Sequence, residues 1–224
     1  MAAGVASYPW NNAVKITALT ATFERPQAFE LCKKYMAAQT RQPDQWLILD
    51  GPEGMADKVA AAVEEGKVEG DAIIFFEDDD FFTPGWIEWC EKKLERYDLV
   101  GEGLALYYNV GRRWWSPCAN RMHASLCQTA ITRVMYEPLV NVIRAHNCPW
   151  FDTQLWKIEC NKFLELPKDG ERRLIGIKGM PGKNGYSREH RKFDPRGCNR
   201  DPSMRKLWEL IGKDAAAYAQ FLQR

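Results

Sequence analysis

The chain lacks any long hydrophobic run, and this absence excludes a membrane-spanning protein. No stretch of the 224 residues approaches the roughly 18–20 apolar residues that cross a bilayer. The segment 1–10 contains neither Lys nor Arg and no long apolar run, so it does not resemble a secretory signal peptide. We therefore predict a protein that stays in the cytoplasm and has no membrane partner.

Paired cysteines are also absent. The seven cysteines are odd in number and scattered, and no two of them form a C-x-x-C pair. This pattern excludes a disulfide framework and a cysteine-based zinc site, so we expect reduced thiols.

Low-complexity segments are missing too, and the length suits one α/β domain. We predict a single domain over 1–224, with a donor-binding half at about 13–110 and an acceptor and catalytic half at about 111–224.

The formal net charge of +1 hides an uneven distribution of charge. From Glu171 to Lys206 there are eleven Lys or Arg residues against four Asp or Glu residues. A basic segment of this kind favours phosphate-bearing partners, although a solvated basic surface has the same composition.

The first hundred residues alternate between apolar strands and amphipathic helices. Strands are predicted at 13–20, 45–49 and 71–76, and helices from 26, over 55–65 and over 84–96. Three strand–helix units in succession predict a doubly wound, mostly parallel sheet flanked by helices. Later in the chain we expect strands near 99–101, 105–108, 125–131, 163–166 and 174–177, helices over 136–145 and 152–159, and a C-terminal helical extension over 202–221.

Four adjacent carboxylates, Glu77 to Asp80, directly follow the third apolar strand. Ligands of open α/β sheets bind beyond the carboxyl ends of the strands, so the position suits a binding site. Adjacent carboxylates repel one another unless a cation neutralises them, and oxygen ligands favour Mg²⁺ or Mn²⁺. The alternative is an acidic turn that caps the helix after Pro84.

The segment Phe75-Phe-Glu-Asp-Asp-Asp-Phe-Phe-Thr-Pro-Gly-Trp-Ile-Glu88 resembles the acidic D-x-D segment of nucleotide-sugar glycosyltransferases of the A-type fold. The resemblance implies a Rossmann-like GT-A fold. It also implies that Asp79 binds the metal that bridges the donor diphosphate, with Glu77, Asp78 or Asp80 helping through the ribose or metal-bound water. Glutamate at the first acidic position departs from the commonest pattern of that family.

The N-terminal third extends the resemblance. Thr20-Ala-Thr-Phe-Glu-Arg-Pro26 is similar to the family's first loop, and Leu47-Ile-Leu-Asp-Gly51 is similar to its second strand. The likeness implies that Thr20, Arg25 and Asp50 contact the nucleotide of the donor, which we expect to be a UDP-sugar.

In the second half, Asp152 stands before a predicted helix, where inverting members of the family have their general base. Base catalysis needs a carboxylate that accepts the proton of the acceptor hydroxyl. An N-cap for the helix is an equally good interpretation of the same residue.

The segment Gly176-Ile-Lys-Gly-Met-Pro-Gly-Lys-Asn-Gly185 has glycine at every third position. Glycines allow backbone N–H groups to approach an anion, and Lys178 and Lys183 add positive charge for the donor phosphates. The resemblance implies a late loop that closes over the donor, with His190 completing the metal site.

Aromatic side chains gather at Trp114, Trp115 and Trp150, where sugars or bases could stack, unless these rings belong to the core. Arg191 and Lys192 are candidates for acceptor binding. Phage-type enzymes resemble the chain in its acidic turn, its Asp-x-x-Leu-Trp segment and its Ile-Lys-Gly-x-Pro-Gly loop. Some of them glycosylate hydroxymethyl pyrimidines in DNA, an acceptor that would place this protein in a host cytoplasm.

Other functions remain open at this stage. They are transfer of a hexose or pentose to a surface or capsular saccharide, a metal-dependent nuclease or phosphohydrolase, and a non-catalytic nucleotide-binding module. A two-metal nuclease would usually draw carboxylates from several distant segments, whereas this sequence has one acidic cluster.

Overall fold

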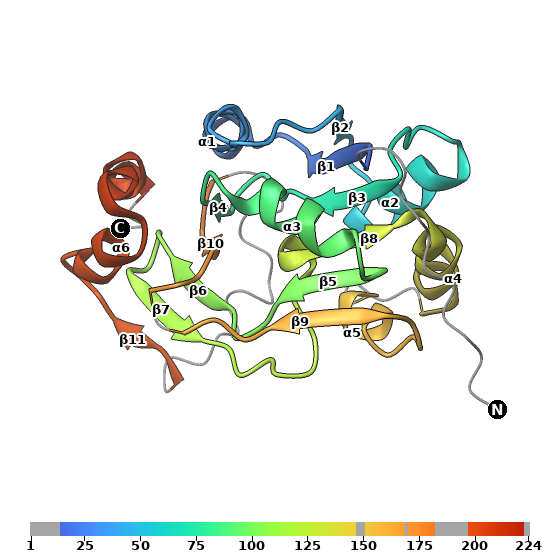
Figure 1. Ribbon diagram of the computed structural model, residues 1–224. Coiled ribbons are helices and arrows are strands. Elements are labelled where there is room, and N and C mark those ends of the chain that lie inside the picture. The colour runs from blue at the N-terminus through green and yellow to red at the C-terminus, as the bar shows by residue number, and fades with distance from the viewer. Residues whose placement is uncertain (1–13, 147–150, 169, 182–196, 222–224) are drawn as a thin grey trace.

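The computed structural model describes residues 14–146, 151–168, 170–181 and 197–221. A six-stranded sheet in the order β2-β1-β3-β8-β5-β9 forms its centre (Figure 1). Its strands are β1 (Ile16–Thr22), β2 (Gln45–Asp50), β3 (Ala72–Phe75), β5 (Leu99–Glu102), β8 (Thr129–Thr132) and β9 (Lys162–Glu165). Strand β8 runs antiparallel to both of its neighbours, and the other pairs are parallel. The mostly parallel sheet predicted from the sequence is therefore confirmed.

Helices cover both faces of this sheet. Buried residues of α1 (Pro26–Ala37) and α3 (Trp86–Leu94) share one core cluster with strand residues such as Ile74. Those of α2 (Met55–Glu64), α4 (Tyr136–His146) and α5 (Phe151–Leu155) share a second cluster with Ile73. Neighbouring residues of a strand point to opposite faces, so β3 buries apolar side chains on both sides. This explains why its sequence is continuously apolar.

A second, five-stranded sheet adjoins the first in the order β11-β7-β6-β10-β4. It consists of β4 (Phe81–Phe82), β6 (Leu106–Asn109), β7 (Trp114–Pro117), β10 (Leu174–Lys178) and β11 (Asn199–Arg200). Strand β10 lies between β4 and β6, so this sheet joins segments from both halves of the chain. The sequence analysis did not predict β4, β7 or β11.

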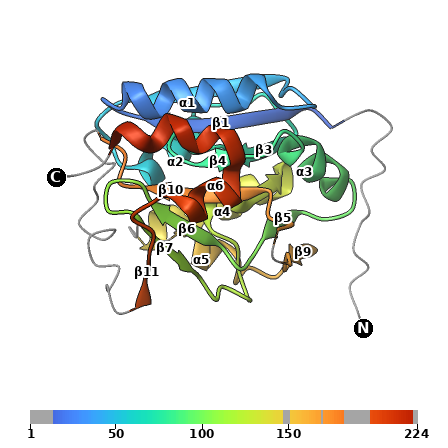
Figure 2. The ribbon, with the colours of Figure 1, turned by 90° about the vertical axis from the view of Figure 1, so that its left-hand side faces the viewer.

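The C-terminal segment packs against α1 and the second sheet (Figure 2). It forms α6 (Arg205–Ile211) and the 3-10 helix η5 (Gly212–Phe221), so the helical extension predicted over 202–221 changes its geometry at Gly212. The hydroxyl of Tyr218 lies 2.9 Å from that of Tyr35 in α1, and both residues are buried. Asp201 accepts hydrogen bonds from the backbone N–H of Lys206, at 3.0 Å, and from the Tyr108 hydroxyl, at 2.8 Å, which ties the start of α6 to β6.

Two predicted elements differ in extent. The strand expected at 125–131 begins at Thr129, because 126–128 form the short 3-10 helix η1. The helix expected at 152–159 is α5, which ends at Leu155.

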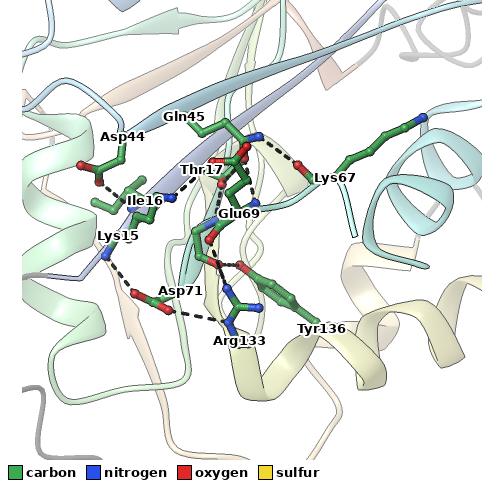
Figure 3. A network of polar contacts seen from close by, with 11 residues as sticks. Lys15, Ile16, Thr17, Asp44, Gln45, Lys67, Glu69, Asp71, Arg133 and Tyr136 are labelled. Carbon is green, nitrogen blue, oxygen red and sulfur yellow. Dashed lines mark hydrogen bonds and ion pairs between the residues drawn. The ribbon is translucent and has the colours of Figure 1, made fainter. Parts of the chain in front are cut away.

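A polar network that includes Thr17, Gln45, Arg133 and Tyr136 lies at the N-terminal ends of β1, β2 and β3 (Figure 3). The backbone N–H of Gly70 donates to Thr17 Oγ1 at 2.9 Å, and that hydroxyl donates to Gln45 at 2.7 Å. The Gly70 carbonyl accepts hydrogen bonds from Arg133 at 2.7 Å and from Tyr136 at 3.0 Å. The network is thus a structural feature at the end of the sheet opposite the acidic turn.

We predict that Gly70→Ala destabilises the protein by about 1–3 kcal/mol, as overpacking typically does. A Cβ at this position would lie 2.6 Å from the backbone nitrogen of Thr17 and 2.8 Å from the carbonyl oxygen of Lys15. Urea unfolding of the variant measures the loss. Gly66→Ala is not a suitable control, because Gly66 has a φ of +67°; Gly85→Ala is better, because a Cβ there meets nothing within 4 Å. Equal stability of the Gly70 and Gly85 variants would contradict the prediction.

Candidate functional site

The acidic cluster, Glu77 to Asp80, lies where β3 ends and before β4 begins. Asp78, Asp79 and Asp80 are all buried. The first sheet places this turn beside the loop that follows β1, because β1 and β3 are parallel neighbours. The expectation that the carboxylates follow a buried strand is confirmed.

Arg25, from the loop after β1, is a direct partner of the cluster. One of its guanidinium nitrogens lies 2.6 Å from Asp78 Oδ1 and the other lies 2.7 Å from Asp79 Oδ2. The hydroxyl of Thr22 donates to the other oxygen of Asp78 at 2.8 Å. The first loop therefore holds the acidic turn through one bridging cation.

Lys178, at the end of β10, approaches the cluster from the second sheet. Its Nζ lies 3.0 Å from Asp80 Oδ1 and 3.7 Å from Asp79 Oδ1. The backbone N–H of Ile177 donates to the same oxygen of Asp80 at 2.8 Å. Burial opposes the charged form of Lys178, but the carboxylates of Asp79 and Asp80 raise its pKa well above the ordinary value, so the ammonium stays protonated.

Among the described residues, two cations, Arg25 and Lys178, contact the four-carboxylate cluster, so its negative charge is only partly neutralised. Burial, reinforced by the charge of Asp80, raises the pKa of Glu77 to about 8. Burial, reinforced by the charge of Asp79, raises the pKa of Asp78 to about 6. Oδ2 of Asp80 is buried without a hydrogen-bond partner among the described residues. Negative charge and an unused oxygen are what a bound divalent cation would neutralise and occupy.

The donor atoms present fit such a cation. Carboxylate oxygens of Glu77 and Asp80 and the Sγ of Cys127 lie within 4.8 Å of one another. Burial raises the pKa of the Cys127 thiol well above its ordinary value, so the thiol stays protonated and is a poor metal ligand. The effective donors are oxygens, which favour Mg²⁺ or Mn²⁺ over zinc.

The segment from Ser125 to Cys127 connects Asp152 to the acidic cluster. The Leu126 backbone N–H donates to the carboxylate of Asp152, which also accepts a hydrogen bond from the Thr153 N–H at 2.8 Å. The next residue, Cys127, lies beside Asp80. Burial raises the pKa of Asp152, which brings it closer to that of a general base at neutral pH. Asp152 lies inside the first turn of α5 rather than before the helix, so its hydrogen bond to Thr153 braces that turn and is a structural role that competes with catalysis.

The two other predicted nucleotide contacts have different surroundings. Thr20 is completely buried, and its hydroxyl donates to the Phe76 carbonyl at 2.7 Å and accepts a hydrogen bond from Trp46 at 2.9 Å. It therefore braces β1 against the acidic turn. Asp50 is exposed at the end of β2.

Sequence reasoning missed Lys58 of α2. Its ammonium donates to the carbonyls of Thr22, at 2.8 Å, and Leu49, at 3.2 Å, across the ends of β1 and β2. Burial lowers the pKa of Lys58, and the negative charge of nearby Asp50 partly offsets this lowering. A single lysine in an amphipathic helix carries no sequence signal that would have identified it.

A shallow cavity, open to solvent, lies on the other side of Lys178. Its lining residues come from β6, β7, β10 and the segment before β11: Tyr107, Asn109, Trp114, Trp115, Ser116, Lys178 and Cys198. The structure therefore places Trp114, a predicted acceptor contact, in the wall of a cavity, whereas Trp115 borders the cavity but packs against the core cluster that contains α1 and α3. The remaining predicted site residues, Trp150, Lys183, His190, Arg191 and Lys192, lie outside the described residues.

Glycines of β10 and of the turn after it shape this cavity. A Cβ on Gly176 would lie 2.4 Å from the ring of Tyr107, its partner in β6, and a Cβ on Gly179 would lie 2.4 Å from Oδ1 of Asn109. Gly179 also has a φ of +80°. The sequence analysis interpreted these glycines as a cradle for an anion, whereas in the structure they give the side chains of β6 room to pack.

No helix among the described residues has the length and apolar character needed to cross a membrane.

Comparison with models of protein families finds no match, and no curated protein matches the sequence. Solved structures do resemble the fold. Residues 1–349 of TarS from S. aureus in complex with UDP match with a TM-score of 0.50 and 8% identity, over 73% of this chain and 60% of that one. The mannosyltransferase PcManGT from Pyrobaculum calidifontis, in complex with GDP-Man and Mn²⁺, matches with a TM-score of 0.46 and 12% identity, over 81% and 61% of the two chains. A197 from STIV matches with a TM-score of 0.44 and 17% identity, over 75% and 97%.

The chain thus spans about three fifths of the TarS fragment that it matches. At such low identity the likeness establishes the fold alone. The sheet order, the flanking helices and the match to TarS together show that this chain has a GT-A-type α/β fold.

Proposed function

We propose that this protein is a metal-dependent glycosyltransferase that moves a sugar from a nucleotide-diphosphate sugar to an acceptor hydroxyl. The observation that carries the proposal is the buried acidic cluster at the carboxyl end of β3, where Arg25 and Lys178 neutralise only part of its charge. The GT-A-type fold supports it. TarS, which shares this fold, has been solved with UDP, and this agrees with a UDP-sugar as the donor.

In this proposal Asp79 and Asp80 hold the divalent cation, with Glu77 close by. When bound, the cation supplies Lewis-acid stabilisation of the departing diphosphate. Arg25 and Lys178 neutralise part of the carboxylate charge in the free protein and would bind diphosphate oxygens in the complex. Asp50 contacts the nucleoside at the end of β2.

Asp152 serves as the general base and accepts the proton of the acceptor hydroxyl. Its burial and raised pKa suit this role, and the segment from Ser125 to Cys127 holds it near the cluster. A base that activates the acceptor for direct attack on the sugar carbon inverts the anomeric configuration. We therefore propose an inverting reaction.

For the acceptor we propose a hydroxymethyl pyrimidine in DNA. The excess of positive charge between Glu171 and Lys206 and the aromatic cavity beside Lys178 support a phosphate-bearing acceptor. A base within a duplex would have to be extruded to reach the site. The alternative acceptor is a surface or capsular saccharide.

One assay tests the donor and acceptor proposals together. Radiolabelled UDP- and GDP-sugars are incubated with the protein and Mn²⁺, alone and with hydroxymethylated DNA, unmodified DNA or a panel of oligosaccharides. We expect slow hydrolysis of one donor without acceptor, loss of that hydrolysis when EDTA is added, and transfer of label to hydroxymethylated DNA only. Label on oligosaccharides alone would reject the DNA acceptor but keep the transferase. Cleavage of DNA without use of any donor would replace the proposal with a nuclease.

A further inference from the structure

The cavity lined by Tyr107, Trp114 and Trp115 shares one residue with the acidic cluster. Lys178 lines the cavity, and its ammonium lies 5.7 Å from the centre of the Tyr107 ring and 3.0 Å from Asp80 Oδ1. A ligand in the cavity would therefore lie one side chain away from the proposed metal and diphosphate. An acceptor must lie this close to the donor, and a ligand in a remote surface pocket would not.

The candidate base is connected to the same cavity. The hydroxyl of Tyr107 lies 2.5 Å from Ser125 Oγ, and the next residue, Leu126, donates its backbone N–H to Asp152. Cavity, acidic cluster and base thus meet around the segment from Ser125 to Cys127. Three elements of the proposed reaction converge on one short segment.

The cavity is shallow and open to solvent, so it cannot enclose the donor. A ligand there would lie against its aromatic walls. Indole and phenol walls offer flat apolar surfaces for a ring, and Asn109 and Ser116 add polar groups at its edge.

Positively charged side chains around the aromatic walls determine which kind of ligand the cavity favours. The guanidinium of Arg112 lies 5.1 Å from the centre of the Trp114 ring. Arg200 is exposed on β11 directly opposite Trp114. The seven lining residues include no carboxylate. The rim therefore favours an acceptor that carries negative charge next to its ring.

Aromatic platforms surrounded by cations are the usual means by which proteins bind single-stranded nucleic acid, with bases stacked on the rings and phosphates on the cations. We propose that this cavity binds one unpaired or extruded nucleobase of the acceptor, and that Arg112 and Arg200 bind the flanking phosphates. This inference rests on the proposed transferase function and specifies its acceptor site.

The transfer step balances with the residues in place. The hydroxyl oxygen of the acceptor forms a bond to the anomeric carbon while the bond from that carbon to the diphosphate oxygen breaks. The bonding pair leaves with the nucleoside diphosphate, and the hydroxyl proton passes to Asp152.

The test measures binding of a fluorescein-labelled single-stranded oligonucleotide that contains one 5-hydroxymethylcytosine. We expect Trp114→Ala to weaken binding about tenfold or more, since stacking on one aromatic side chain contributes that much. Trp208→Ala is the matched control, because this indole is 47% exposed and does not line the cavity. Arg112→Gln should weaken binding and lower the slope of log K against log salt by about one, as expected when one phosphate contact is lost.

Three further measurements keep the outcome unambiguous. Thermal unfolding shows whether each variant is folded, and calorimetry with UDP and Mn²⁺ shows whether the donor site is intact. If UDP does not bind the wild-type protein, the proposed function fails, whatever the oligonucleotide does. If UDP binds but Trp114→Ala and Trp208→Ala bind the oligonucleotide as wild type does, the acceptor site is wrong and the transferase proposal stands. Displacement of the labelled oligonucleotide by a neutral oligosaccharide would assign the cavity to a saccharide instead.

Discussion

Asp79→Asn is expected to reduce sugar transfer by roughly 10²–10³-fold and to abolish the enhancement of UDP binding by Mn²⁺. Lewis-acid stabilisation of a leaving group is worth several kcal/mol, and about 1.4 kcal/mol corresponds to a factor of ten in rate. The substitution keeps the shape of the side chain and removes its charge. Calorimetry with UDP, in the presence and absence of Mn²⁺, measures the loss directly.

The fold should survive this change. Arg25 retains its contact with Asp78, at 2.6 Å, and the asparagine oxygen can still accept a hydrogen bond from the guanidinium. Asp57→Asn removes one exposed carboxylate from the surface of α2 and serves as the matched control for charge. If Asp79→Asn binds UDP and Mn²⁺ with wild-type affinity, the metal assignment is wrong. If it fails to fold while the control folds, Asp79 is mainly the structural partner of Arg25.

The parallel core could be predicted because its signal is local. Each of the strands β1, β2 and β3 is a short apolar run followed by a helix with apolar residues at helical spacing. The second sheet has no such signal. β4 and β11 are two residues long, so no alternation can be recognised, and β11 pairs with β7 from a position more than eighty residues further along the chain. Such short strands exist because of their neighbours rather than because of their own sequence.

The site residues, too, could be predicted only in part. The acidic turn and Arg25 could be predicted, because a motif identifies residues that lie close to strand ends. The place of Lys178 between the cluster and the aromatic cavity could not, since it depends on β10 pairing with both β4 and β6. The link from Asp152 through Leu126 uses a backbone N–H, a group that every residue except proline carries. Sequence patterns identify the chemically distinctive residues and miss the ordinary groups that position them.

Asp152→Asn is expected to lower kcat by roughly 10²–10⁴-fold, the contribution of a positioned general base, and to leave the affinity for UDP nearly unchanged. A base acts only as the proton moves, so its loss affects turnover rather than donor binding. In the wild-type protein the acid limb of the pH–rate profile should lie above the ordinary pKa of an aspartate. Burial raises the pKa of Asp152, and the carboxylate must be deprotonated to accept the proton.

The competing structural role makes the opposite prediction. If Asp152 only braces the first turn of α5, through its hydrogen bonds to the N–H groups of Thr153 and Leu126, its loss should cost about 0.5–2 kcal/mol of stability, as the loss of a cap does, and leave turnover intact. The asparagine oxygen can still accept a hydrogen bond from Thr153, so the two roles separate cleanly in this variant. Turnover, melting temperature and the anomeric configuration of the product are measured on one preparation. Normal turnover in Asp152→Asn, together with a lowered melting temperature in Asp152→Ala, would assign Asp152 to the scaffold, and a retained configuration would exclude it as the base of a direct displacement.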